Sequence, residues 1–171
     1  VIVSIVNKAA GHAMSSKLEL LPFLAALTAA YAIGEGMGRL ACISFGCCYG
    51  KKVNELPQTL QKFFARTSIS YYGKTKKIIA SGGTEGCATA PIQTITSLIY
   101  VTSGTASIYF YLEEKFILSF FLSLTVTQVW RFLSEFLRDD YRGDGKLSAY
   151  QLMSLMIIPY YIIIALSFSP D

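Results

Sequence analysis

Residues 91–112 read PIQTITSLIYVTSGTASIYFYL and contain no charged side chain. A helix rises about 1.5 Å per residue, so a helix over this range is long enough to cross the roughly 30 Å hydrocarbon core of a bilayer. Two further apolar runs follow at 116–138 and 147–168, and an earlier one covers 18–45. We therefore expect about four membrane-spanning helices over these four ranges.

The composition of the chain agrees with a lipid environment. Hydrophobic residues make up 53% of the sequence and charged residues only 15%, whereas about a quarter of a soluble domain is charged. The expected fold class is all-α, a polytopic transmembrane helix bundle that forms a single membrane domain over 1–171. Because the chain opens VIVSIVNK without Met, we expect it to be the C-terminal part of a longer protein.

The one long polar segment, 51–90, is expected to form a polar loop or a small extramembrane subdomain. Within it, TLQKFFARTSISYY (59–72) is suited to an interfacial helix, and GKTKKII (73–79) with SGGTEG (81–86) to a short hairpin. The segment holds seven of the fifteen basic residues, so the positive-inside rule would place it in the cytoplasm.

Charged residues interrupt the third apolar run. Gln128, Arg131, Glu135 and Arg138 are spaced by 3, 4 and 3, which predicts that all four project from one helical face. An ionised group inside a bilayer costs several kcal/mol unless it is paired, so this face is a candidate functional site. The alternative is an Arg–Glu–Arg ladder near the interface that only orients the helix.

The first run ends with glycines and one arginine. Gly34 and Gly38 form a small-xxx-small pair suited to close approach of another helix. The same glycines could instead let backbone amides approach an anionic head group, with Arg39 supplying the positive charge. Packing alone does not account for Arg39 at the edge of an apolar run.

The cysteines and the single histidine are weaker candidates. Cys42, Cys47 and Cys48 are spaced five apart and then adjacent, which fits the usual Cys-x2-4-Cys spacing of zinc ligands poorly. We expect them and Cys87 to be small buried residues rather than metal ligands. His12 is either a general base at the membrane surface or a surface residue without a role.

Four segments, in order, resemble the bacterial prolipoprotein diacylglyceryl transferase family. GRLACISFGCCYG (38–50) resembles its signature in the form Gly-Arg-x-Gly-Cys-Phe-x-x-Gly-Cys-Cys-Tyr-Gly, a cysteine-containing, divergent branch. The Pro-x-Gln of residues 91–93 resembles a helix start of the family. RFLSEFLRDDYRG (131–143) resembles its Arg-x-x-x-Glu-x-x-Arg helix, and LSAYQLMSL (147–155) the Ser-x-x-Gln-x-x-Ser start of its last helix.

The resemblance implies transfer of a diacylglyceryl group from phosphatidylglycerol to the lipobox cysteine of a prolipoprotein signal peptide, in the bacterial inner (plasma) membrane. It implies no cofactor, no metal and no nucleic acid. By the resemblance the site residues are Arg39, Arg131 and Glu135 as catalytic groups, and Gly38, Gly50, Arg138, Gln93 and Gln151 as substrate-binding groups. His12 is a possible base on its own chemistry and is not equated with the histidine of the family.

This sequence departs from the family pattern at two signature positions. Cys42 stands where other members carry Asn, and Cys47 where they carry Glu, which removes a possible acidic partner of Arg39. A non-catalytic phospholipid-binding membrane protein is therefore one alternative, and a membrane thiol or redox protein that uses Cys47 or Cys48 is another. The family places its signature toward the extracytoplasmic face, and we favour this orientation over the charge rule.

Overall fold

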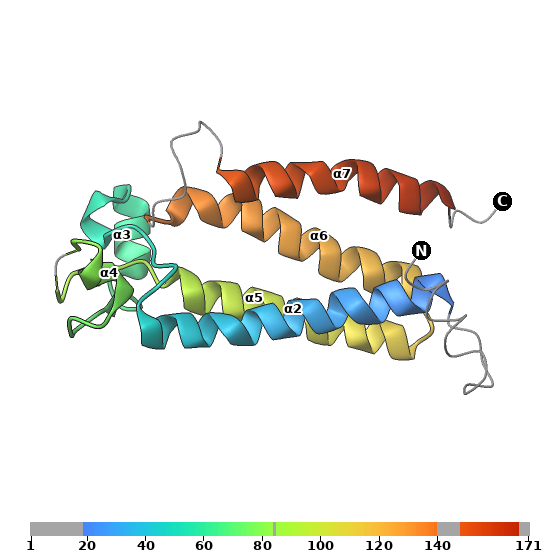
Figure 1. The fold of residues 1–171 in the computed structure, drawn as a ribbon, viewed down its shortest axis with the longest axis horizontal. Coiled ribbons are helices and arrows are strands. Elements are labelled where there is room, and N and C mark those ends of the chain that lie inside the picture. Colours follow the sequence, from blue (N-terminus) through green and yellow to red (C-terminus); the bar gives the residue numbers. More distant parts are fainter. Residues whose placement is uncertain (1–18, 84, 140–147, 168–171) are drawn as a thin grey trace.

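The computed structural model describes residues 19–83, 85–139 and 148–167. Figure 1 shows that the long helices run side by side, with a small subdomain at one end of the bundle. The helices are α2 (Leu20–Phe45), α5 (Ile92–Leu112), α6 (Phe116–Ser134) and α7 (Ala149–Ser167). Helices α2, α5 and α6 pack against one another, and α7 packs on α6. The expected helical class is confirmed.

The interior of the bundle combines apolar side chains, such as Phe120 and Leu124, with many small polar ones, and large apolar side chains are exposed on its exterior. Small hydroxyl side chains are buried between α5 and α6, among them Ser97, Ser103, Ser107, Ser119, Ser123 and Thr127. Large apolar side chains point outward, among them Leu27, Met37, Phe45, Leu98, Leu112, Val129 and Leu133. Helices that associate within lipid use small and polar residues for their contacts. This inside-out distribution favours a bundle surrounded by lipid.

Hydrogen bonds satisfy several of the buried hydroxyls. Ser119 Oγ donates to the carbonyl oxygen of Ser107 at 2.7 Å, and the Tyr100 hydroxyl donates to that of Thr127 at 2.9 Å. By length and composition, two stretches of the described chain qualify as membrane spans, Leu20–Phe45 and Phe116–Leu137. The spans expected at 91–112 and 147–168 coincide with α5 and α7, and their crossing of the membrane stays a prediction.

Close packing of α2 on α5 depends on glycines other than the expected pair. A Cβ built on Gly36 would lie 2.9 Å from Val101 Cγ2 and 3.1 Å from the Val101 backbone nitrogen. On α5, a Cβ built on Gly104 would lie 2.6 Å from Ile33 Cγ1 of α2. In contrast, a Cβ on Gly34 or Gly38 would lie within 4 Å of no atom of the described residues. The expectation that Gly34 and Gly38 form the helix contact is wrong, because they lie on a different face of α2.

This difference gives a prediction on stability. We expect Gly36→Ala to destabilise the bundle by about 1–3 kcal/mol, because the added methyl must push α2 away from α5. Gly38→Ala is the matched control, and its effect should be neutral or stabilising by up to about 1 kcal/mol, since alanine favours the helix. Thermal unfolding of both variants in detergent measures the difference. Equal melting temperatures would contradict the packing described.

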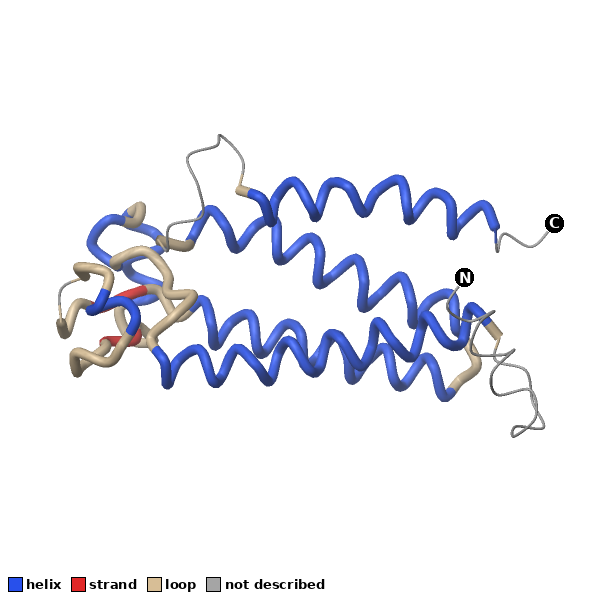
Figure 2. Tube along the Cα trace, viewed as in Figure 1, coloured by secondary structure: helices blue, strands red, loops and turns tan. Residues whose placement is uncertain are grey.

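The segment between α2 and α5 folds into a small subdomain of short elements, which we call the head (residues 46–91). Its helices are η1 (Val53–Glu55), α3 (Gln58–Phe64) and α4 (Lys77–Ala80), and Figure 2 shows its two short strands. The strands are β1 (Ile69–Ser70) and β2 (Ala88–Thr89), which pair antiparallel. The hairpin expected over 73–86 is wrong: residues of this range form α4, and the strands lie on either side of it.

A short stretch of backbone at 49–52 joins the head to the bundle. The Lys51 N–H donates to the carbonyl oxygen of Leu137 at 2.9 Å, and the Lys51 carbonyl accepts from the Ala90 N–H at 2.9 Å. Gly50 forms a β-bridge with Arg138. A Cβ on Gly50 would lie 2.5 Å from the Ala90 carbonyl oxygen, so only glycine fits here. The ends of α6 and α2 are therefore held together through this stretch.

Candidate functional site

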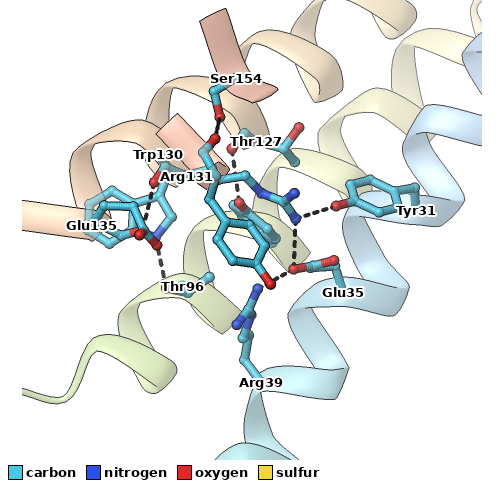
Figure 3. Close-up of polar contacts among 12 residues, drawn as sticks. Tyr31, Glu35, Arg39, Thr96, Thr127, Trp130, Arg131, Glu135 and Ser154 are labelled. Atoms are coloured by element: carbon cyan, nitrogen blue, oxygen red, sulfur yellow. Dashed lines mark hydrogen bonds and ion pairs between the residues drawn. The ribbon is translucent and has the colours of Figure 1, made fainter. Parts of the chain in front are cut away.

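A row of polar side chains runs along one face of α2 near the head. Tyr31, Glu35 and Arg39 are spaced four residues apart, and side chains at this spacing lie above one another on a helix. The Glu35 carboxylate accepts a hydrogen bond from Arg39 on the same helix, and Arg131 Nη2 of α6 donates to the same Oε1 at 3.0 Å (Figure 3). Glu35 thus links the two arginines that the sequence analysis singled out separately.

Arg131 connects three helices. Its Nη2 also donates to the Tyr31 hydroxyl of α2 at 2.6 Å, and its guanidinium carbon lies 5.8 Å from the ring centroid of Tyr150 on α7. Only 17–20% of the Arg131, Arg39 and Glu35 side chains is exposed. We call Tyr31, Glu35, Arg39, Arg131 and Tyr150 the arginine cluster. Charges this far withdrawn from water interact strongly, because the surroundings screen them little.

The charges of the arginine cluster suit an anionic ligand. Two guanidinium groups and one carboxylate leave a formal charge of plus one, and each arginine has five N–H donors. Glu35 uses few of these donors, so others can bind phosphate oxygens in the bidentate manner typical of arginine. Arg39 lies six residues before the end of α2, about 9 Å along the axis. The arginine cluster therefore lies near the head end of the bundle.

Glu135 and Arg138 form a separate pair. The α-helix of α6 ends at Ser134, and Glu135–Leu137 continue as the 3-10 turn η2. Arg138 Nε lies 3.9 Å from Glu135 Oε1, and these side chains are only 7% and 6% exposed. In Figure 3 Glu135 lies beside Trp130, away from Glu35. The expected single face of four residues is therefore split, and Arg131 is paired across helices with Glu35.

The two glutamines predicted to bind substrate have structural partners. Gln93 is 1% exposed at the start of α5, and its Nε2 donates to the Cys47 carbonyl oxygen at 3.0 Å and to the Tyr71 hydroxyl at 2.6 Å. Burial raises the pKa of the Tyr71 phenol. Gln151 Oε1 accepts from the Ser148 N–H at 2.9 Å, and Ser148 Oγ accepts from the Gln151 N–H at 3.2 Å. This reciprocal pair is a capping box that starts α7.

Two further predicted residues, Gly50 and Gly38, lie in the described part of the chain. Gly50 is explained by its contact with Ala90, and a Cβ on Gly38, the neighbour of Arg39, would contact none of the described residues. His12 lies outside the residues that the structure describes. The roles proposed for these residues stay predictions.

Glu35 is a site residue that was not predicted from the sequence. The acid absent from the signature at Cys47 has a substitute one turn before Arg39, because Glu35 is the partner of that arginine. The spacing Glu35–Arg39 is an i,i+4 ion pair and was the available signal. Tyr31 precedes Glu35 by the same spacing. Tyr150 gave no such signal, because its contact with Arg131 arises from the packing of α7 on α6.

Three cysteines come together at the end of α2. The Sγ atoms of Cys42, Cys47 and Cys48 all lie within 4.8 Å of one another. All are partly buried thiols rather than disulfides. Their irregular spacing in the sequence was therefore a poor guide to their distance in space.

Comparisons with known proteins identify the family. The sequence model of the family described as prolipoprotein diacylglyceryl transferase matches residues 2–167. Neither the curated proteins nor the solved structures gave a match to the chain. The matched range includes the signature with Arg39, the helix that carries Arg131 and all of α7. The chain belongs to the prolipoprotein diacylglyceryl transferase family, whose members are membrane transferases of lipoprotein biosynthesis.

Proposed function

We propose that this protein transfers the diacylglyceryl group of phosphatidylglycerol to the thiol of a lipobox cysteine in a prolipoprotein signal peptide. The single observation that carries the proposal is the arginine cluster, in which Glu35 joins Arg39 and Arg131 between two helices. An anionic phospholipid offers a phosphodiester at the edge of the hydrocarbon core. The position of the arginine cluster near the end of α2 suits that depth.

The proposed reaction places specific demands on the site. The sulfur of the substrate thiolate attacks the glyceryl carbon that bears the phosphate ester, and the carbon–oxygen bond breaks. The bonding electrons leave with glycerol phosphate, whose phosphate gains one negative charge, and the proton of the thiol passes to a base or to water. Arg39 and Arg131 stabilise this developing charge. In a site with little water, such electrostatic stabilisation is usually the largest single contribution to catalysis. Glu35 positions both guanidinium groups.

The proposed membrane arrangement has α2, α5, α6 and α7 spanning the bacterial inner membrane as a multi-pass bundle. The large apolar side chains exposed on the helices and the small polar ones buried between them support this arrangement. The head then lies outside the hydrocarbon core, on the extracytoplasmic side, where a signal peptide emerging from the membrane can reach the arginine cluster.

The test is an assay with the full-length protein purified in detergent. Phosphatidylglycerol and a synthetic lipobox peptide are added, and mass spectrometry follows the peptide while released glycerol phosphate is quantified. We expect the peptide to gain one diacylglyceryl group per glycerol phosphate released. Phosphatidylethanolamine is the matched donor control, and it should give little product because its head group carries no net charge. If the protein binds phosphatidylglycerol but transfers no diacylglyceryl group to the peptide, the enzymatic proposal is contradicted.

A non-catalytic phospholipid-binding protein is the second candidate. The observation that favours it is the presence of Cys42 and Cys47 at signature positions that carry Asn and Glu in other members. The same assay separates the two candidates. A binding protein would retain phosphatidylglycerol through purification and release no glycerol phosphate on addition of the peptide.

A further inference from the structure

The turn that ends α2 gathers the three thiols. Gly46 has φ 62° and ψ 33°, its N–H donates to the Ile43 carbonyl oxygen at 3.2 Å, and the Cys47 N–H donates to the Cys42 carbonyl oxygen at 3.1 Å. These two bonds define a Schellman motif, in which the side chains at the positions of Cys42 and Cys47 come into contact. The chain then turns at Cys48, whose φ is 57°. A positive φ is uncommon outside glycine, and the Sγ of Cys48 lies within 4.8 Å of the other two.

The geometry of the three sulfur atoms matches a metal site. Zinc binds thiolates at about 2.3 Å, and tetrahedral coordination then puts the sulfur atoms roughly 3.8 Å apart. The three Sγ atoms all lie within 4.8 Å of one another, within about 1 Å of this separation. Among the described residues, this group of three is the only set of Cys, His, Asp and Glu side chains close enough to hold an ion.

A second observation at the same place points to a missing ligand. Gln93 lies against the cysteine turn, because its Nε2 donates to the Cys47 carbonyl oxygen. Its Oε1 is buried and has no hydrogen-bond partner among the described residues. A buried acceptor without a donor costs about 1–3 kcal/mol, so such atoms are rare without an ion or water nearby. A water bound to a metal is a strong donor and would satisfy this acceptor.

We propose that Cys42, Cys47 and Cys48 bind one zinc ion through three thiolates. The fourth coordination position is open to water or to another small ligand. The ion joins the last turn of α2 to the first residues of the head. The zinc site is an additional site, separate from the proposed site of diacylglyceryl transfer. None of the three cysteines belongs to the arginine cluster, so zinc binding does not depend on the transfer reaction.

The test measures metal binding by the full-length protein in detergent under reducing conditions. After equilibration with Zn²⁺ and removal of the excess, elemental analysis should find one zinc per chain. Replacement by Co²⁺ should give the intense near-ultraviolet absorption of thiolate-to-metal charge transfer. Cys42→Ser, Cys47→Ser and Cys48→Ser should each weaken zinc binding by about 100-fold or more, since changes even to outer partners of a site cost 10- to 100-fold.

Cys87→Ser is the matched control, because Cys87 lies outside the group of three thiols. It should bind zinc as the unaltered protein does. A second measurement needs no variant: bound zinc should protect three thiols from alkylation and leave Cys87 reactive. Absence of stoichiometric zinc, equal loss of zinc in Cys87→Ser, or a mass lower by about 2 Da that reveals a disulfide between two of the three cysteines would each overturn the proposal.

Discussion

Arg131→Ala is expected to lower diacylglyceryl transfer by at least about 10²- to 10³-fold, the loss typical of removing one donor to a developing negative charge. Arg131 is the residue through which α2, α6 and α7 meet in the arginine cluster, with bonds to Tyr31 and Glu35 and a ring contact to Tyr150. Its removal takes away the charge from α6 and leaves Arg39 as the one remaining guanidinium of the arginine cluster. A lone arginine paired with Glu35 has no net charge to offer to phosphate.

The measurement is the initial rate of peptide lipidation, with thermal unfolding recorded on the same preparations. Lys115→Ala is the charge-matched control, because Lys115 is 59% exposed in the turn between α5 and α6. Arg131→Lys keeps the charge but loses the planar, forked set of donors, and we expect it to recover only a small part of the rate. Full activity of Arg131→Lys would show that charge alone suffices and would contradict bidentate binding of phosphate.

The helices and the two arginines could be predicted from the sequence, because hydropathy and helical spacing are local properties. The link between the arginines could not. The i,i+4 spacing pairs Glu35 with Arg39 alone, and its second partner, Arg131, is 96 residues away in the chain. Only the packing of α2 on α6 brings this carboxylate between two guanidinium groups, so the pairing is a property of the tertiary structure.

Errors at the ends of elements have a common physical cause. Helical spacing placed Glu135 and Arg138 on the face of Arg131, but the α-helix stops at Ser134 and the backbone of Arg138 pairs with Gly50 of the head. The spacing of the three cysteines was likewise read along the chain, whereas the Schellman turn at Gly46 reverses the direction of the backbone. Turns and bridges change the periodicity on which such predictions rest.

Glu35→Gln is expected to have opposite effects on catalysis and on product binding. The amide keeps the size of the side chain but removes the charge that holds Arg39 and Arg131 in place. We expect transfer to fall by about 100-fold, because misplaced catalytic groups cost on this order. At the same time, glycerol phosphate should bind several-fold more tightly, since no internal carboxylate competes with it for the guanidinium groups.

The two effects together distinguish positioning from simple structural support. Inhibition of transfer by glycerol phosphate gives the product affinity, and the turnover number gives the catalytic effect. Glu55→Gln is the matched control, because Glu55 forms an exposed ion pair with Lys52 in the head, and it should change neither quantity. If Glu35 only stabilised the fold, its replacement would lower the melting temperature and the amount of active protein without tightening the binding of glycerol phosphate. Tighter product binding at a lower turnover number therefore requires Glu35 to act on the arginines that contact the phosphate.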